Sequence, residues 1–178
     1  MLRWITALSF ALATSAAALP TQAQVWVPAW TASPAPDRQD GTPEAPVQFA
    51  NQTVRQDMRL ASSATALRFR ITNELGVAPL HIGGATAQRT GTATPARLVS
   101  FNGRSGVTGP VGAGLLSDPV PMAVPALADV SLTVYFPEPT QPGVRRTALR
   151  IADGRQADVA DKVKLAYRQN VVSAGVAE

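Results

Sequence analysis

The chain lacks cysteine altogether and has a single histidine, His81, among its 178 residues. Without cysteine it can form no disulfide, no thiolate zinc site and no cysteine nucleophile. A serine triad needs an imidazole beside the nucleophile, but His81 lies between Leu80 and Ile82 on an alternating segment, where we expect it to point outward. The Gly-x-Ser-x-Gly motif of serine hydrolases is also absent. We therefore expect no metal, no cofactor and no catalytic residue in this chain.

Charged and aromatic residues are also scarce, at 16% and 6%, whereas proline (15) and glycine (13) are plentiful. This balance favours short strands joined by turns over long helices. The net charge is +4, but the arginines are scattered and no basic run alternates with aromatic residues. We therefore expect no nucleic-acid partner. An acidic surface, such as an anionic cell-wall polymer, stays open as a partner.

No hydrophobic run is suited to a membrane span, and the apolar stretch at residues 5–19 is too short for one. Arg3 precedes this Ala-rich stretch, and Pro20 with Ala23 suits signal-peptidase cleavage before Gln24. We expect residues 1–23 to be a signal peptide and the mature protein to be secreted or periplasmic.

The mature chain alternates apolar and polar residues in short runs bounded by glycine, proline and asparagine turns. About eight to ten such runs predict an all-β fold, an antiparallel β-sandwich with jelly-roll-like connections. We expect residues 24–46 to contain a strand at 25–31 and a Pro-rich loop. Residues 47–178 would form the sandwich, with the first strand packed on it.

The clearest strand begins at Thr65, where Leu67, Phe69 and Ile71 alternate with polar residues. A second alternating run, residues 52–61, precedes this strand and is joined to it by a short connection, so we predict an antiparallel hairpin. The polar face of this hairpin would carry four arginines close together: Arg55, Arg59, Arg68 and Arg70. These either face solvent, pair with Asp57 and Glu74, or bind an anionic partner.

Two tryptophans open the mature chain, Trp26 and Trp30, four positions apart and so on one face of an extended segment. Such residues more often anchor a terminal strand in a core than stack on sugar rings, and both interpretations stay open. Tyr135, near the end of a later strand, is a further aromatic candidate. The candidate ligand surface comprises Trp26, Trp30, Arg55, Arg68, Arg70 and Tyr135.

Several segments occur in an order that matches a known family. They are WVPAWTASP (26–34), FANQTVRQDMR (49–59), LRFRITNELG (67–76), PLHIGG (79–84), VSFNGRSGV (99–107), LSDPV (116–120) and PALADVSLTVYF (125–136). Together they resemble the N-terminal β-domain of secreted Gly-Asp-Ser-Leu (SGNH/GDSL) hydrolases, the esterase/lipase superfamily. Each segment is weakly specific alone, and the ordered set is more specific.

The resemblance implies a following α/β domain, whose first strand ends in the Gly-Asp-Ser motif with the nucleophile and which carries an Asp-x-x-His pair. Neither motif occurs in this sequence, so no catalytic residue is carried over. Residues 163–178 resemble the linker strand before that domain, and residues 144–152 match the family poorly. We therefore expect a truncated or split product.

Two functions from different classes follow. The first is a non-catalytic accessory β-domain of a secreted GDSL-type esterase, with the catalytic SGNH domain as its partner and with contact to an ester or polysaccharide substrate. The alternative is a free-standing secreted module that binds carbohydrate or the cell envelope. A third interpretation, hydrolysis by this chain through His81, needs a positioned base that the sequence around His81 does not offer.

Overall fold

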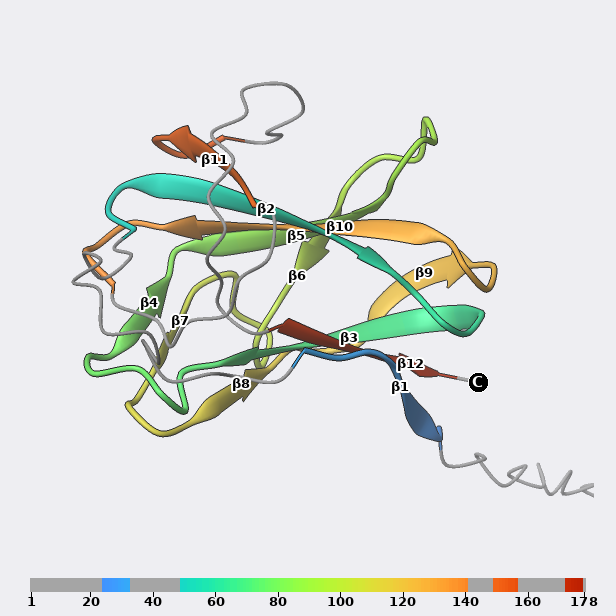
Figure 1. Cartoon of the computed structure of the whole chain (residues 1–178), viewed down its shortest axis with the longest axis horizontal. Coiled ribbons are helices and arrows are strands. Elements are labelled where there is room, and N and C mark those ends of the chain that lie inside the picture. The colour runs from blue at the N-terminus through green and yellow to red at the C-terminus, as the bar shows by residue number, and fades with distance from the viewer. Residues whose placement is uncertain (1–23, 33–48, 141–148, 157–171, 178) are drawn as a thin grey trace, which may run out of the picture.

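The computed structural model describes residues 24–32, 49–140, 149–156 and 172–177 (Figure 1). The predicted signal peptide and the Pro-rich loop lie outside these ranges. The sequence also predicts a short helical turn at 157–163 and a final strand at 164–172, of which only Val172 is described. Nothing in the structure tests those predictions.

Two five-stranded sheets and one two-stranded sheet make up the described part of the chain, and every strand pair is antiparallel. The first sheet contains β1 (Trp26–Trp30), β12 (Val172–Ala177), β3 (Ala64–Thr72) and β8 (Gly114–Leu116) in this order, with β9 (Val120–Val124) also paired to β3. The second contains β11 (Arg150–Asp153), β2 (Gln52–Arg59), β10 (Asp129–Phe136), β5 (Gly84–Arg89) and β6 (Arg97–Val99). The small sheet pairs β4 (Leu80–Ile82) with β7 (Val107–Gly109).

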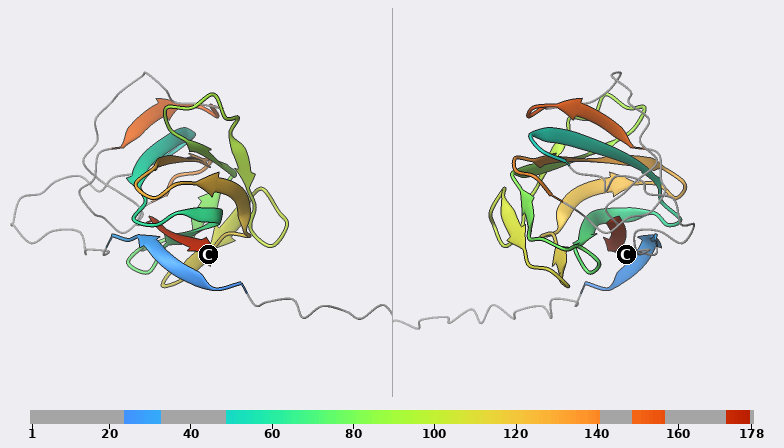
Figure 2. Two further views of the ribbon diagram at one scale, coloured as in Figure 1. Left: turned by 90° about the vertical axis from the view of Figure 1, so that its right-hand side faces the viewer. Right: turned by 60° about the vertical axis from the view of Figure 1, so that its left-hand side comes forward.

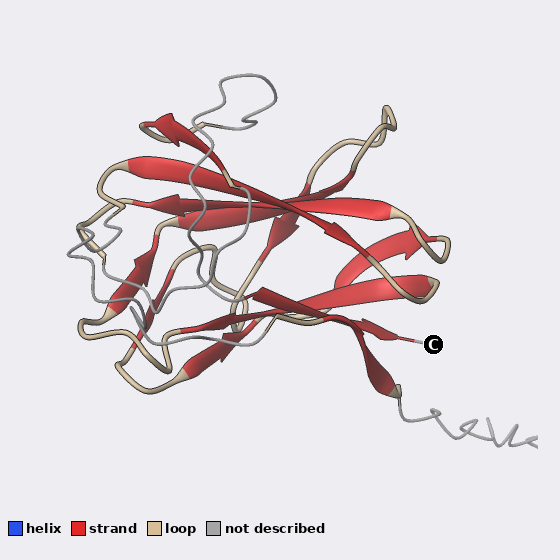
Figure 3. Cartoon of the chain, viewed as in Figure 1, coloured by secondary structure: helices blue, strands red, loops and turns tan. Residues whose placement is uncertain are grey.

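The two large sheets lie one over the other, with β2, β10 and β11 in one layer and β1, β3 and β12 in the other (Figure 2). No helix occurs among the described residues (Figure 3). The predicted all-β, antiparallel, sandwich-like fold is therefore confirmed, while the jelly-roll-like connectivity stays a prediction. The described residues form twelve strands, more than the eight to ten expected. Four of them, β4, β6, β7 and β8, have only three residues each, too few for an alternating pattern to reveal them.

The core lies between the two large sheets. Leu67, Phe69 and Ile71 of β3 are fully buried, as their alternation predicted, and belong to one cluster with Met58 of β2 and Leu132 of β10. Full burial of each such side chain stabilises the fold by about 1.5–3 kcal/mol. The sandwich is thus held mainly by apolar residues that alternate along its long central strands.

The predicted hairpin between residues 52–61 and the strand from Thr65 is wrong, because β2 and β3 belong to different sheets. All eight residues of β2 pair with β10, whereas β3 pairs with β12, β8 and β9. Leu60, fully buried, exchanges backbone hydrogen bonds with the turn before β10 and starts the crossing from one layer to the other. A crossing lets the apolar faces of both strands meet across the core, whereas a hairpin would set them side by side.

Candidate functional site

Trp26 and Arg68 meet on the outer face of the first sheet. The guanidinium carbon of Arg68 lies 5.2 Å from the centroid of the Trp26 ring, within the range of a cation–π contact. Arg68 Nε also donates a hydrogen bond of 3.0 Å to the carbonyl oxygen of Ser117. Both groups therefore have partners within the fold.

Trp30 does not share that face with Trp26. The register of β1 shifts between Pro28 and Trp30, and Trp30 packs against the core cluster. The expectation that the two tryptophans lie on one face is wrong, because an irregularity of this kind breaks the simple alternation of a strand. Trp30 anchors the terminal strand, which was one of the two uses considered for it.

The predicted four-arginine face does not form either. Arg68 and Arg70 lie on β3 of the first sheet, whereas Arg55 and Arg59 lie on β2 of the second. Arg70 pairs with the carboxylate of Glu74, and this hydrogen bond holds the pKa of Glu74 below its usual range.

Arg55 is buried and takes part in a charge cluster on the outer face of the second sheet. Its Nε lies 3.1 Å from Asp57 Oδ1, and Arg150 Nη1 lies 2.9 Å from Asp57 Oδ2. One carboxylate therefore bridges two guanidinium groups from neighbouring strands. Both guanidinium groups therefore have a carboxylate partner within the fold.

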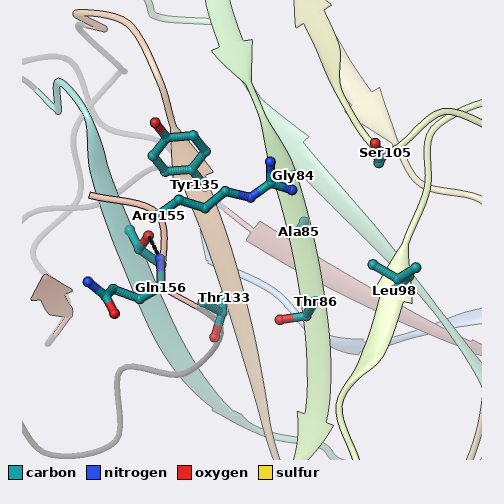
Figure 4. A pocket seen from close by; sticks show the side chains of 10 residues that line it. Gly84, Ala85, Thr86, Leu98, Ser105, Thr133, Tyr135, Arg155 and Gln156 are labelled. Atoms are coloured by element: carbon teal, nitrogen blue, oxygen red, sulfur yellow. Dashed lines mark hydrogen bonds between the residues drawn. The ribbon is translucent and has the colours of Figure 1, made fainter. Parts of the chain in front are cut away.

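Tyr135, the remaining candidate, lines a pocket of about 350 Å³ on the same outer face (Figure 4). That volume lies at the lower end of the range of about 300–1,000 Å³ that is usual for small-molecule sites. The lining comes from β2, β5, β6, β10 and two loops: Thr53, Gly84, Ala85, Thr86, Leu98, Ser105, Thr133, Tyr135, Arg155 and Gln156.

Strand register assembles the floor of this pocket. Tyr135 lies opposite Gly84, Thr133 lies opposite Thr86, and Thr86 in turn lies opposite Leu98. Because side chains two apart on a strand share a face, these residues project from the sheet together. Tyr135 is also fixed at its far end, since its hydroxyl donates a 2.9 Å hydrogen bond to Asn51 Oδ1.

The loop after β11 forms one wall and is tied to the sheet by three hydrogen bonds. The Gly154 amide donates to the carbonyl of Asn51 (2.6 Å), the Thr53 hydroxyl donates to the carbonyl of Gly154 (2.7 Å), and the Gln156 amide donates to the Thr53 hydroxyl (3.0 Å). These bonds place Arg155, between Gly154 and Gln156, over the sheet.

Arg155 extends across the pocket, with its guanidinium above the β5 backbone (Figure 4). The guanidinium carbon is 5.7 Å from the centroid of the Tyr135 ring. A Cβ at position 84 would lie 3.0 Å from Arg155 Nη2, so the absence of a side chain at Gly84 makes room for the cation. Within the described residues no carboxylate pairs with Arg155.

His81 points away from the core, as predicted, while Leu80 and Ile82 beside it are buried. Its Nδ1 is 3.0 Å from the Thr108 hydroxyl, and its Nε2 is 3.5 Å from Glu138 Oε2. The hydroxyl beside the imidazole thus belongs to a threonine on the neighbouring strand. Among the described residues no three His, Asp or Glu side chains gather as a metal site would require.

The sequence indicated only one residue of this pocket, Tyr135. Arg155 carries a weak signal, since it follows the turn residues Asp153 and Gly154, and glycine within a strand, as at Gly84, often marks the close approach of another group. Neither signal identifies a site before the strand order is known.

A scan against protein-family models finds no match for this sequence, and a search of curated proteins finds none either. The described residues contain no helix with the length and apolar character needed to cross a membrane.

Proposed function

We propose that this chain is the non-catalytic β-sandwich domain of a secreted GDSL-type ester hydrolase. The observation that carries the proposal is that residues from separate family-like segments bind one another. Segments that belong to one inherited domain are expected to be held together by specific polar contacts. Two such meetings support the proposal, and a buried asparagine of one segment also fixes the loops beside it.

Asp118, in the segment LSDPV, accepts hydrogen bonds from the segment VSFNGRSGV. The donors are the Gly103 amide at 2.7 Å, the Asn102 amide at 3.0 Å and the Ser100 hydroxyl at 2.7 Å. These bonds, with the Gly103 amide foremost, hold the pKa of Asp118 below its usual value. The carboxylate therefore fixes the tight turn at Asn102 and Gly103 against the connection between β8 and β9.

Asn73, in the segment LRFRITNELG, is buried where β3 ends. Its side-chain amide donates to the carbonyls of Ala78 (2.9 Å) and Pro110 (3.2 Å), and its backbone carbonyl accepts from the Gly76 and Gly112 amides. It therefore joins the loop after β3 to the loop before β8.

The second meeting between segments joins three of them around Tyr135 of PALADVSLTVYF. Its hydroxyl binds Asn51 of FANQTVRQDMR, and its carbonyl accepts a 2.9 Å hydrogen bond from the Gly83 amide of PLHIGG. Polar residues of the ordered segments thus serve one arrangement of strands, as expected if the segments belong to one inherited domain.

The loops joined by Asn73 supply the surface on which we place the catalytic domain. Of the seven large hydrophobic side chains exposed among the described residues, three lie on these loops: Leu75, Val77 and Val111. Val77 is 74% exposed. Exposed apolar side chains gathered on fixed loops are typical of a contact with another domain. Packing there would let this domain shape access to the substrate.

The test starts from the coding sequence that follows the codon for Glu178. We expect it to encode a Gly-Asp-Ser motif and, further on, an Asp-x-x-His pair. The encoded domain should co-elute with this chain in gel filtration and hydrolyse p-nitrophenyl acetate. Absence of such a coding sequence, or of association, contradicts the proposal.

A paired variant tests the surface itself. Val77→Asp with Val111→Asp should weaken the association about tenfold or more, because two charges would be buried against an apolar partner. Leu127→Asp is the matched control, since Leu127 is also exposed but lies on the turn between β9 and β10. Equal weakening by the control would remove the assignment of this surface.

The alternative, a free-standing module for carbohydrate or the cell envelope, is favoured by the pocket beside Tyr135. The two functions separate by experiment. Retention on an insoluble polysaccharide without any catalytic partner supports the module, whereas association with an encoded hydrolase domain supports the accessory domain.

A further inference from the structure

We propose that the pocket between Tyr135, Arg155 and Leu98 binds a uronic acid unit of an anionic polysaccharide, with the sugar carboxylate on Arg155. The inference rests on the pocket alone and does not depend on a hydrolase partner. It names a site and a ligand chemistry for the outer face of the second sheet.

Arg155 provides the pocket with a cation that can bind a carboxylate. Arg155 has one face on the Tyr135 ring, and no carboxylate among the described residues pairs with its guanidinium. A guanidinium carries five donors in a planar fork that matches a carboxylate through two parallel hydrogen bonds. With its ring face occupied, Arg155 offers its N–H edge to a ligand.

The pocket is also lined by hydroxyl groups that could bind a sugar. The hydroxyl groups of Thr86, Thr133 and Ser105 make no hydrogen bond to another described residue, although all three line the pocket. A hydroxyl can donate one hydrogen bond and accept two, which suits the hydroxyl groups of a sugar ring. A ligand of this kind would satisfy donors and acceptors that the fold leaves to solvent.

Leu98 forms an apolar wall of the pocket. Leu98 faces the pocket from the opposite side to Arg155 and is 76% exposed (Figure 4). A sugar ring has apolar C–H faces as well as hydroxyl groups, so it can rest against Leu98 while its carboxylate meets Arg155. A phosphate or another small inorganic anion would use the cation but not this wall.

The site is also largely preformed. The loop that carries Arg155 is fastened through Thr53 and Asn51, and Gly84 leaves the space that the guanidinium occupies. Preformed donors cost less conformational entropy on binding than donors on a free loop. The acidic side chain nearest in sequence, Asp153, accepts a 3.1 Å hydrogen bond from the Gln52 amide.

The probes are a short oligogalacturonate, the matching neutral galacto-oligosaccharide and inorganic phosphate, each titrated calorimetrically into the full mature chain. We expect the oligogalacturonate to bind about tenfold or more tightly than the neutral oligosaccharide, because only the former has a carboxylate for Arg155. Equal binding of the two sugars, or binding of phosphate alone, overturns the proposal.

Three variants locate the binding. Arg155→Gln should weaken oligogalacturonate binding about tenfold or more, and Arg155→Lys should recover part of it, because a lysine keeps the charge without the planar fork. Arg59→Gln removes the same charge from an exposed position at the other end of β2 and should leave binding unchanged. Thermal unfolding of each variant verifies the fold. Equal losses in the Arg155 and Arg59 variants would reduce the effect to net charge and refute the site.

Discussion

The outer faces of the two large sheets use their arginines differently. On the first sheet Arg68 covers Trp26 and binds the Ser117 carbonyl, and Arg70 pairs with Glu74. On the second sheet Arg155 lies over a pocket without a carboxylate partner in the described part of the chain. An arginine whose donors are used within the fold contributes to structure, whereas one held over a pocket with donors left over is available to a ligand.

Part of the second sheet resembles the first in this respect. Asp57 bridges Arg55 and Arg150, so these two arginines also have a partner within the fold. The difference is therefore between Arg155 in the pocket and the arginines around it, and not between one whole sheet and the other. Charge on an outer face is therefore a poor guide to function, and the partners of each charge decide it. Three predictions concern residues outside the pocket, which we expect to act on stability.

The largest effect is expected at Gly76, in the loop that Asn73 holds at the end of the first sheet. A Cβ at position 76 would overlap Asn73 Oδ1, so Gly76→Ala must displace the side chain that joins two loops. We expect a loss of about 3 kcal/mol in unfolding free energy, measured by urea denaturation. Ala93→Ser, at an exposed position in the loop between β5 and β6, should change it by less than about 0.5 kcal/mol. An unchanged midpoint for Gly76→Ala would mean that Asn73 does not hold these loops.

A smaller effect is expected at Arg68. Arg68→Ala removes the contact with the Trp26 ring and the hydrogen bond to Ser117, which together are worth about 1–2 kcal/mol of unfolding free energy. Binding of oligogalacturonate should be unchanged, whereas Arg155→Gln should show the reverse pattern. Loss of binding in Arg68→Ala would contradict the assignment of this face to structure.

The smallest effect is expected from the protonation of Asp118. Hydrogen bonds from Gly103, Ser100 and Asn102 lower its pKa in the folded state below the ordinary value of 3.8. The stability that this carboxylate contributes is therefore complete above pH 3.8 and is lost as the pH falls through the lower, folded-state pKa.

Asp118→Asn tests this direction of the pH dependence of stability. The variant should have a lower melting temperature than the wild type at pH 6, and the difference should shrink as the pH is lowered below 3.8. Ser105→Ala, outside the Asp118 hydrogen bonds, should keep a constant difference. A gap that widens in acid would contradict the role given to Asp118.

Local alternation was enough to predict the long central strand β3 and its buried face. Leu67, Phe69 and Ile71 are core because a period of two is visible within the nine residues of β3. The pairing of the strands was not predictable in the same way, since β2 chooses β10 and not β3, its neighbour in sequence. Pairing is decided by which apolar faces meet across the core.

The pocket was less predictable than the fold for the same reason. Tyr135, Gly84 and Arg155 are brought together by strand register and by a loop that Thr53 fastens, and none of these is local in sequence. The register shift in β1 that separates Trp26 from Trp30 is equally invisible in an alternating pattern. The ligand surface expected from sequence therefore combined residues from the outer faces of both large sheets with Trp30, which packs on the core.

The central claim is that the ligand site lies on the second sheet and not on the arginine-bearing face of the first. Amide NMR spectra of the isotope-labelled mature chain, recorded during titration with oligogalacturonate, test it most directly. We predict shift changes at Gly84, Tyr135, Arg155 and Gln156, and none at Trp26 or Arg68. Changes centred on Trp26 and Arg68, with a silent pocket, would contradict the claim.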